Sequence, residues 1–308
     1  MNSNSRRSFL QSAAALAALS PAPAHGEGQT TGALLPTVKF GKQEITRMIA
    51  GSNPFYGYSH FNRIFDQIMR EWYTQDRKME VLHACEREGI NTWQFPYDDL
   101  PVEDLKRYRA EGGHLHIVLL AESELMKNPG LLPQAAKLGP LGIAYHGSRT
   151  DGLFRSGETQ QIKDFLKAVR DVGVMAGVST HNPAVVDTAE SEGWEVDYYQ
   201  TCLYRVTRTP EEARAEFKEA PIGETYMEKD PERMCRMIRQ TKKPCLAFKL
   251  FGAGRTVANP RQIEAAFRFA LSNIKPTDSV IVGMFPRFSD QVQENTGMVR
   301  RILSTPKV

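Results

Sequence analysis

The sequence predicts an eight-stranded β/α barrel. Apolar runs typical of buried strands alternate with segments of helical period, and the strands recur at spacings of about thirty residues. Polar residues follow the strands, where parallel α/β folds place their sites. No G-x-G-x-x-G sequence follows the first strand, so a doubly wound open sheet is the less economical alternative. We therefore expect one barrel over residues 38–308.

The strands are expected where buried apolar runs are bounded by turn residues. A hairpin-like segment with its turn at Gly41 comes before them. The predicted strands are Ile45–Ala50, Asn91–Phe95, His116–Leu120, Gly142–Tyr145, Met175–Val178, Tyr198–Leu203, Cys245–Lys249 and Ser279–Gly283. An insertion at about 207–230, opened by a capping box at Thr209, interrupts the alternation. It is either a lid or a solvated connector.

Composition limits the class of partner. The 308 residues are 41% hydrophobic and 24% charged with a net charge of +3, which is ordinary for a globular domain with a buried core. The basic residues are spread along the chain without a long Lys/Arg block, which argues against a nucleic-acid partner. No window of about eighteen apolar residues follows the amino-terminal leader, so we expect no membrane span in the mature protein.

The amino terminus carries an export pattern. Residues 5–10 read SRRSFL, an Ala-rich run covers 12–19, and 22–24 supply small residues for cleavage. This resembles a twin-arginine signal, which directs folded proteins across the bacterial inner membrane; an ordinary secretory leader is the weaker alternative. We expect a signal peptide over 1–24, a flexible leader over 25–37, the twin-arginine export machinery as a partner, and a periplasmic mature protein.

Four cysteines, Cys85, Cys202, Cys235 and Cys245, lack zinc-finger or redox spacing. A bridge between Cys202 and Cys245 is conceivable on neighbouring strands in an oxidising compartment. Buried thiols are the preferred interpretation, because a domain of this size does not need disulfides for stability.

Chemically capable side chains gather at the predicted strand ends. Each has an ordinary packing explanation by itself, but a set that points to one barrel mouth indicates a site. In barrel order these residues are Asn53, Gln94, Glu122, His146, Ser179, His181, Gln200, Tyr204, Lys249 and Arg287.

The motifs LGIAYHGSRTD, VDYYQTCLYR and VIVGMFPRFSDQVQEN resemble, in sequence and spacing, the aldo/keto reductase superfamily. The resemblance runs from about residue 38 to residue 302. That family is an eight-stranded β/α barrel that uses NADPH without a Rossmann fold. The resemblance therefore implies NADP as cofactor and an oxidoreductase acting on a small carbonyl or sugar-type substrate.

The resemblance carries some functional residues onto this chain. It implies that His146 is catalytic and that Ser179 and Gln200 face the nicotinamide. The cofactor-binding set that it implies is Ser179, Gln200, Arg287, Glu294 and Asn295, with the last two at the adenine and Arg287 at a phosphate.

The proton-handling residues depart from the family. Its Asp falls at Gln94, which cannot form an ion pair, and its Tyr acid falls near Asp99, with Tyr97 two residues away. Its Lys falls at or beside Glu122, whose charge would raise rather than lower the pKa of a neighbouring Tyr. An oxidoreductase with tightly held NAD(P) would thus use His146 or Tyr97 as acid/base.

A second function is a non-redox enzyme on a carbohydrate-like substrate. Glu122, His146 and His181 lie on three consecutive strands and supply donors for a divalent metal. Lys249 would act as base or Schiff-base amine if burial lowers its pKa. Isomerisation, epimerisation or elimination beside a carbonyl suits this set.

A third function is a non-catalytic barrel that binds a carbohydrate through residues at its mouth, namely Phe55, Tyr56, Tyr58, His60 and Tyr204. Whichever function applies, the predicted substrate-binding residues are Asn53, Tyr56, Gln94, His181 and Tyr204. Aromatic side chains are also ordinary barrel packing, so fold alone does not choose among the three functions.

Overall fold

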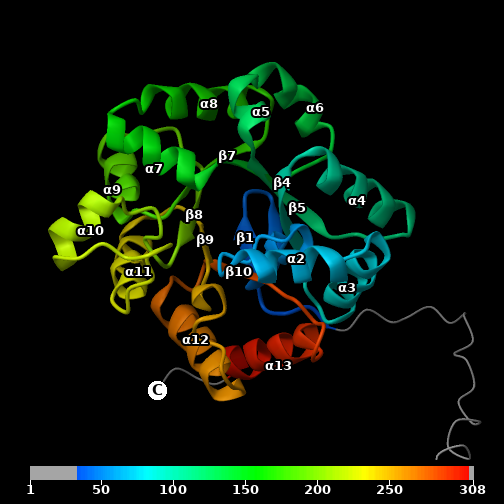
Figure 1. Cartoon of the computed structure of the whole chain (residues 1–308). Helices are drawn as coiled ribbons and strands as arrows, with labels where there is room; N and C mark the ends of the chain where they lie inside the picture. The colour runs from blue at the N-terminus through cyan, green and yellow to red at the C-terminus, as the bar shows by residue number, and fades with distance from the viewer. Residues whose placement is uncertain (1–32, 305–308) are drawn as a thin grey trace, which may run out of the picture. The chain divides into compact units, whose positions relative to one another are not determined.

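The computed structural model describes residues 33–304, and within them the chain forms a closed parallel barrel ringed by helices (Figure 1). The barrel order is β10-β3-β4-β5-β6-β7-β8-β9, so the predicted eight-stranded barrel is confirmed. The strands are β3 (Met48–Gly51), β4 (Thr92–Tyr97), β5 (His116–Ala121), β6 (Gly142–Tyr145), β7 (Met175–Thr180), β8 (Tyr198–Cys202), β9 (Cys245–Phe248) and β10 (Ser279–Gly283).

Helices connect successive strands on the outside of the barrel. Before β6 these are η1 (Asn53–Tyr56), α2 (Arg63–Trp72), α3 (Gln75–Arg87), α4 (Asp99–Ala110), α5 (Ser123–Lys127), η2 (Pro129–Leu131) and α6 (Leu132–Ala136). After β6 they are α7 (Gly147–Ser156), α8 (Gln160–Asp171), α9 (Pro183–Ser191), α10 (Pro210–Phe217), α11 (Asp230–Gln240), η3 (Gly252–Gly254), α12 (Pro260–Asn273) and α13 (Gln291–Ser304). None of the helices described is long and apolar enough to cross a membrane.

A separate hairpin precedes the barrel. β1 (Thr37–Phe40) and β2 (Gln43–Thr46) pair antiparallel around the turn at Gly41, and Phe40 packs edge-on against Tyr198 in the barrel interior, with ring centroids 4.9 Å apart. The predicted first strand, Ile45–Ala50, is therefore two strands. The chain turns at Thr46, whose hydroxyl donates to the Met48 carbonyl at 2.7 Å.

The largest side chain of the barrel-interior cluster is Tyr198, whose ring fits against two glycines. Tyr198 is fully buried, and a Cβ on Gly142 or Gly177 would lie 2.5 and 2.4 Å from atoms of its ring. The neighbouring strands β6 and β7 must therefore carry glycine at these two positions. The interior is a packed core below the mouth, as is usual for this fold.

The segment after β8 is an ordered insertion. Thr209 and Glu212 form a capping box at the start of α10, so the predicted capping box is confirmed. Arg208 donates to both carboxylate oxygens of Asp230, at 2.7 and 2.6 Å, and both side chains are buried. This pair holds the beginning of the insertion to the start of α11.

The four cysteines are buried and free. The predicted signal peptide lies outside the described residues, as does most of the predicted leader, of which 33–37 are described.

Candidate active site

Alternation along the strands selects the side chains that face the barrel interior. Tyr198 on β8 belongs to the interior cluster, so Gln200, two residues later on the same strand, shares its direction. Ser179 on β7 lies directly opposite Gln200 in the register, and both side chains are buried. These residues form the floor of the carboxyl end of the barrel.

His146 stands at the end of β6, immediately before α7, beside Glu122 at the end of β5. The two side chains approach to 3.7 Å between His146 Nε2 and Glu122 Oε1. Burial, reinforced by the charges of His181 and Arg149, lowers the pKa of His146 to about 4, so the imidazole is neutral at neutral pH. Burial and the charge of Asp98 raise the pKa of Glu122. His146 is therefore available there as a proton acceptor.

His181 is held by the carboxylate of Asp151, thirty residues earlier in the chain. Asp151 on α7 accepts from His181 Nδ1 at 2.9 Å and from the His181 backbone N–H at 3.1 Å. The hydroxyls of Thr180 and Thr207 donate to the same carboxylate at 2.5 and 2.7 Å. An ionised carboxylate only accepts, so Nδ1 of His181 carries a proton, and in the neutral imidazole Nε2 is the nitrogen that can accept one. Asp151 thus fixes the tautomer of His181, as in carboxylate–histidine pairs of acid–base sites.

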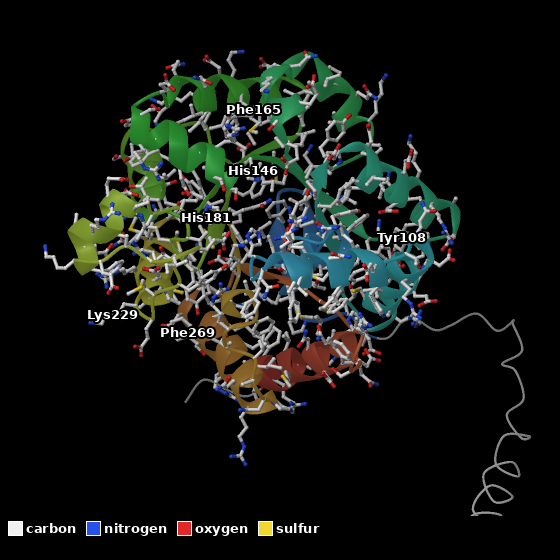
Figure 2. All side chains as sticks on the ribbon, viewed as in Figure 1. Tyr108, His146, Phe165, His181, Lys229 and Phe269 are labelled. Atoms are coloured by element: carbon white, nitrogen blue, oxygen red, sulfur yellow. The ribbon has the colours of Figure 1, made fainter. Side chains whose placement is uncertain are left out.

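Close packing brings the two histidines onto one wall. A Cβ on Gly147 would lie 2.9 Å from His181 Cε1 and 2.9 Å from Ser179 Oγ, so the residue after His146 must be small. Figure 2 shows His146 and His181 near the centre of the ring of strands. The edge of the His181 ring also packs against Phe248 on β9, with centroids 5.6 Å apart.

Lys249 follows Phe248 and carries a buried amine. Its Nζ has no hydrogen-bond partner among the described residues, and its backbone adopts φ 59°, a left-handed conformation unusual for a lysine. Burial lowers its pKa, which nearby Cys202 and Glu224 only partly offset. Phe248 lies opposite Cys202 in the register, so the Lys249 backbone is at the carboxyl end of the barrel, next to β8.

Loops from three strand ends meet next to Lys249. His60, after β3, contacts Glu224 of the insertion at 2.8 Å between Nδ1 and Oε1, and Tyr226 donates to Glu224 Oε2 at 2.8 Å. Arg255, after β9, donates to the His60 carbonyl at 3.1 Å and stacks over the Tyr226 ring at 3.9 Å. Burial opposes ionisation of Glu224, but the hydrogen bond and charge of His60, together with Lys249 and Tyr226, outweigh it and lower the pKa to about 2. We call His60, Glu224, Tyr226 and Arg255 the latch.

Several predicted residues take other roles. The Tyr56 hydroxyl donates to Asp104 at 3.0 Å, and Lys78 donates to the same carboxylate at 2.7 Å, so Tyr56 is committed to the α3–α4 side. Tyr97 is half-buried, and burial together with Asp99 raises its pKa, which weakens it as a proton donor. Tyr204 is buried against the ring of Tyr226, with centroids 5.1 Å apart.

The remaining predicted residues divide between floor and rim. Gln94 on β4 is buried and lies opposite Gly51 in the register. Asn53 is exposed at the start of η1.

The predicted three-ligand metal site is corrected by the geometry. Among residues 33–304, no group of three or more His, Cys, Asp or Glu side chains is arranged to hold a metal ion. Glu122 approaches His146 to 3.7 Å, but Glu122, His146 and His181 together do not form such a group.

The predicted cofactor residues near the carboxyl terminus are spread over α13 and the loop before it. Arg287 is exposed, and Glu294 accepts from Ser289 at 3.0 Å. Asn295 is buried within α13. Of the predicted cofactor set, Ser179 and Gln200 are brought together at the barrel floor.

Comparison with known proteins supports the fold and nothing finer. No family model and no curated protein matches the chain. A truncated 3-deoxy-D-arabino-heptulosonate 7-phosphate synthase from Thermotoga maritima is 15% identical, with a TM-score of 0.51 over 88% of this chain and 91% of that one. Gox0644 in its apo form is 12% identical, with a TM-score of 0.51 over 87% and 93%. At these identities the chain is similar to other barrels in architecture.

Proposed function

We propose that this chain is a non-redox enzyme acting beside the carbonyl of a small carbohydrate-like substrate. The observation that supports this best is the buried amine of Lys249, which has a lowered pKa and no hydrogen-bond partner among the described residues. A neutral amine at a strand end is the form that attacks a carbonyl or removes a proton. The predicted Schiff-base or base function of Lys249 is conditional on burial that lowers its pKa.

The chemistry follows from the groups present. Lys249 Nζ adds to the carbonyl carbon, and loss of the carbonyl oxygen as water leaves a protonated imine. The imine acidifies the neighbouring C–H bond, and His181 Nε2 or His146 accepts that proton. Return of the proton to the opposite face of the same carbon, followed by hydrolysis of the imine, releases the epimer and restores the Lys249 amine. Isomerisation would instead use Lys249 as a simple base, with no imine. Gln94, Ser179 and Gln200 supply hydrogen-bonding groups for substrate hydroxyls.

Borohydride trapping tests this proposal. The full chain is incubated with glyceraldehyde, dihydroxyacetone, ribose or pyruvate, reduced with borohydride, and analysed by peptide mass spectrometry. We expect a reduced adduct on the peptide that carries Lys249 and its loss in Lys249→Met. Lys242→Met, at an exposed lysine, is the matched control. Adduct levels at Lys249 no higher than at Lys242 for every compound would overturn the imine step. Solvent deuterium uptake by the same compounds would then test Lys249 as a simple base.

A second candidate is the oxidoreductase with NADP that the family resemblance implies. Its support is the pairing of buried Ser179 and Gln200 at the floor beside His146. The raised pKa of Tyr97 works against a proton donor there. NADPH fluorescence titration of wild type and Gln200→Ala tests it: saturable binding weakened by the substitution supports the reductase, and no binding by the wild type rejects it.

We also propose export by the twin-arginine route, supported by the SRRSFL sequence. Replacing Arg6 and Arg7 by lysine in the full chain should hold the protein in the cytoplasm of a bacterial host. Unchanged export of the double variant would favour an ordinary secretory leader.

A further inference from the structure

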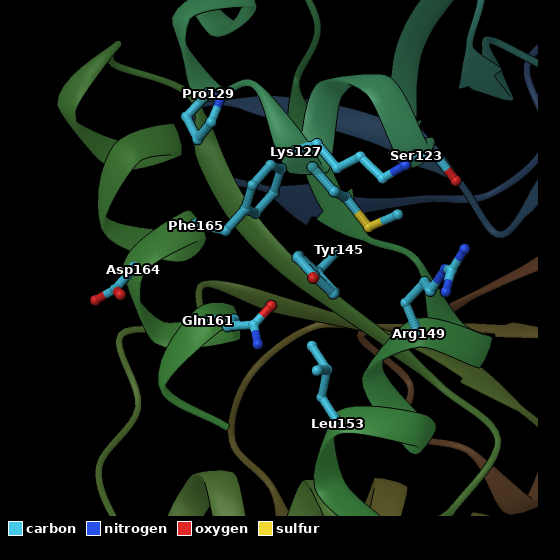
Figure 3. A pocket seen from close by; sticks show the side chains of 10 residues that line it. Ser123, Lys127, Pro129, Tyr145, Arg149, Leu153, Gln161, Asp164 and Phe165 are labelled. Carbon is cyan, nitrogen blue, oxygen red and sulfur yellow. The ribbon is translucent and has the colours of Figure 1, made fainter. Parts of the chain in front are cut away.

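A cavity of about 410 Å³ lies outside the barrel wall, between α5, α7 and α8 (Figure 3). Pockets for small molecules usually have volumes of about 300–1,000 Å³, so this one accommodates a compact ligand. Tyr145 of β6 lies at its centre in the view, with Phe165 of α8 beside it. It is separate from the floor formed by Ser179 and Gln200.

One side of the cavity is cationic. Lys127 of α5 and Arg149 of α7 both line it, and in Figure 3 their charged ends lie on the same side, next to Ser123. Neither side chain makes an ion pair or hydrogen bond with a described residue. Asp164 lies on the opposite side and accepts from Gln160 at 2.8 Å. Arg149 lies within electrostatic range of Glu122, but neither cation is held in an ion pair by a described residue, so the two attract an anionic group.

The rest of the lining is mixed, with Ser123, Gln161 and Asp164 as its polar members. Met126, Leu153, Phe165 and the ring of Tyr145 supply its apolar surface. Such surface contributes binding energy through the burial of a ligand's apolar body, whereas the cations fix its orientation. The lining therefore matches a molecule with an anionic head and a compact apolar body.

We infer that this cavity is a binding site for a small amphipathic anion, whose carboxylate or phosphate lies between Lys127 and Arg149 and whose apolar body packs on Phe165 and Met126. The site adjoins the candidate active site through β6. Tyr145 lines the cavity while His146, the next residue, lies beside Glu122 at the mouth. Arg149 acts electrostatically on both His146 and Glu122. A bound anion would therefore contact Arg149, whose charge also affects the pKa values of His146 and Glu122 at the carboxyl end of the barrel.

Calorimetric titration of the full chain with phenyl phosphate and benzoate tests this site. Inorganic phosphate, which has the anionic group without an aromatic ring, and benzyl alcohol, which has the ring without the charge, are the comparison compounds. We expect saturable binding of at least one aromatic anion, and the tighter of the two identifies the preferred head group. Loss of one charge-assisted hydrogen bond in Arg149→Gln or Lys127→Gln should weaken that binding about tenfold or more. Lys137→Gln, at an exposed lysine on the turn after α6, is the matched control and should leave it unchanged.

A filling variant tests the apolar half of the site. Gln161 lines the cavity from α8 and is exposed, so Gln161→Trp occupies the space without removing a core side chain. We expect it to abolish binding while the thermal unfolding midpoint stays near that of the wild type. Absence of saturable binding up to about 10 mM overturns the proposal. Binding that is equally strong for benzyl alcohol, or unaffected by all three cavity variants, overturns it as well.

Discussion

Asp151 and His181 form a buried pair in which one carboxylate receives both the ring and the backbone N–H of the histidine, at 2.9 and 3.1 Å. The pair joins α7 to the end of β7. It determines which nitrogen of His181 is available for chemistry.

Asp151→Asn tests this pair through stability. The amide keeps the shape but directs an N–H toward donors, so we expect a loss on the order of 2–3 kcal/mol in the free energy of unfolding at pH 7. Asp187→Asn, at an exposed residue on α9, is the control and should change it little. Urea denaturation measures both, and equal midpoints for the two variants would contradict the assigned role.

The same pair predicts a pH dependence. Burial works to raise the pKa of Asp151, but the hydrogen bond and charge of His181 outweigh it and hold the pKa below its ordinary value. A carboxylate with a lowered folded pKa contributes stability above its unfolded pKa, about 3.9, and loses it as the pH falls through the folded value. The stability difference between wild type and Asp151→Asn should therefore be constant above about pH 5 and shrink below pH 4. A difference that grows on acidification would contradict this sign.

For Lys249 we expect that the side chain lowers stability at neutral pH, whereas the Asp151 carboxylate raises it. Its folded pKa lies below its unfolded value of about 10.4, so the unfolded chain binds more protons between the two pKa values and stability rises with pH there. Lys249→Met removes this penalty and should be more stable than wild type at pH 7, with a difference that narrows toward pH 10. Thermal unfolding across that range measures it. A less stable methionine variant at pH 7 would show that the amine has partners in solution.

The buried pair between Arg208 and Asp230 should be sensitive to loss of one partner. Arg208→Met leaves the Asp230 charge buried, and we expect a loss of about 3–5 kcal/mol. Arg214→Met on α10 removes an exposed arginine and should cost less than about 1 kcal/mol. Chemical denaturation compares the two, and similar losses would contradict the distinction.

Gly177 tests the packing of the barrel interior. In Gly177→Ala the new Cβ would lie 2.4 Å from Tyr198 Cζ, so we expect a destabilisation of about 1–3 kcal/mol. Gly152 on α7 has nothing within 4 Å of an added Cβ, and Gly152→Ala should stabilise by about 0.5–1 kcal/mol. A neutral effect at Gly177 would mean that Tyr198 can move.

The barrel was predictable because buried parallel strands leave continuous apolar runs in the sequence. Their ends were harder to predict, since β7 continues through polar Ser179 and Thr180. Helix α7 was not predicted: its sequence contains two glycines and few apolar residues, so packing of Leu153 and Phe154 rather than propensity supports it.

The strand-end residues were located correctly as a class, but their partners were not. The partner of His181 is thirty residues earlier on α7, and Asp104, which holds the Tyr56 hydroxyl, is forty-eight residues later on α4. Such pairings depend on how helices pack around the barrel. No local spacing in the sequence encodes them, and the same holds for the cavity behind β6.

The hairpin of β1 and β2 closes one end of the barrel. Phe40 and Ile45 pack into the barrel interior with Tyr198, so the strand-end residues are reached from the opposite end. A ligand of those residues would therefore enter and leave through the single end that the latch borders.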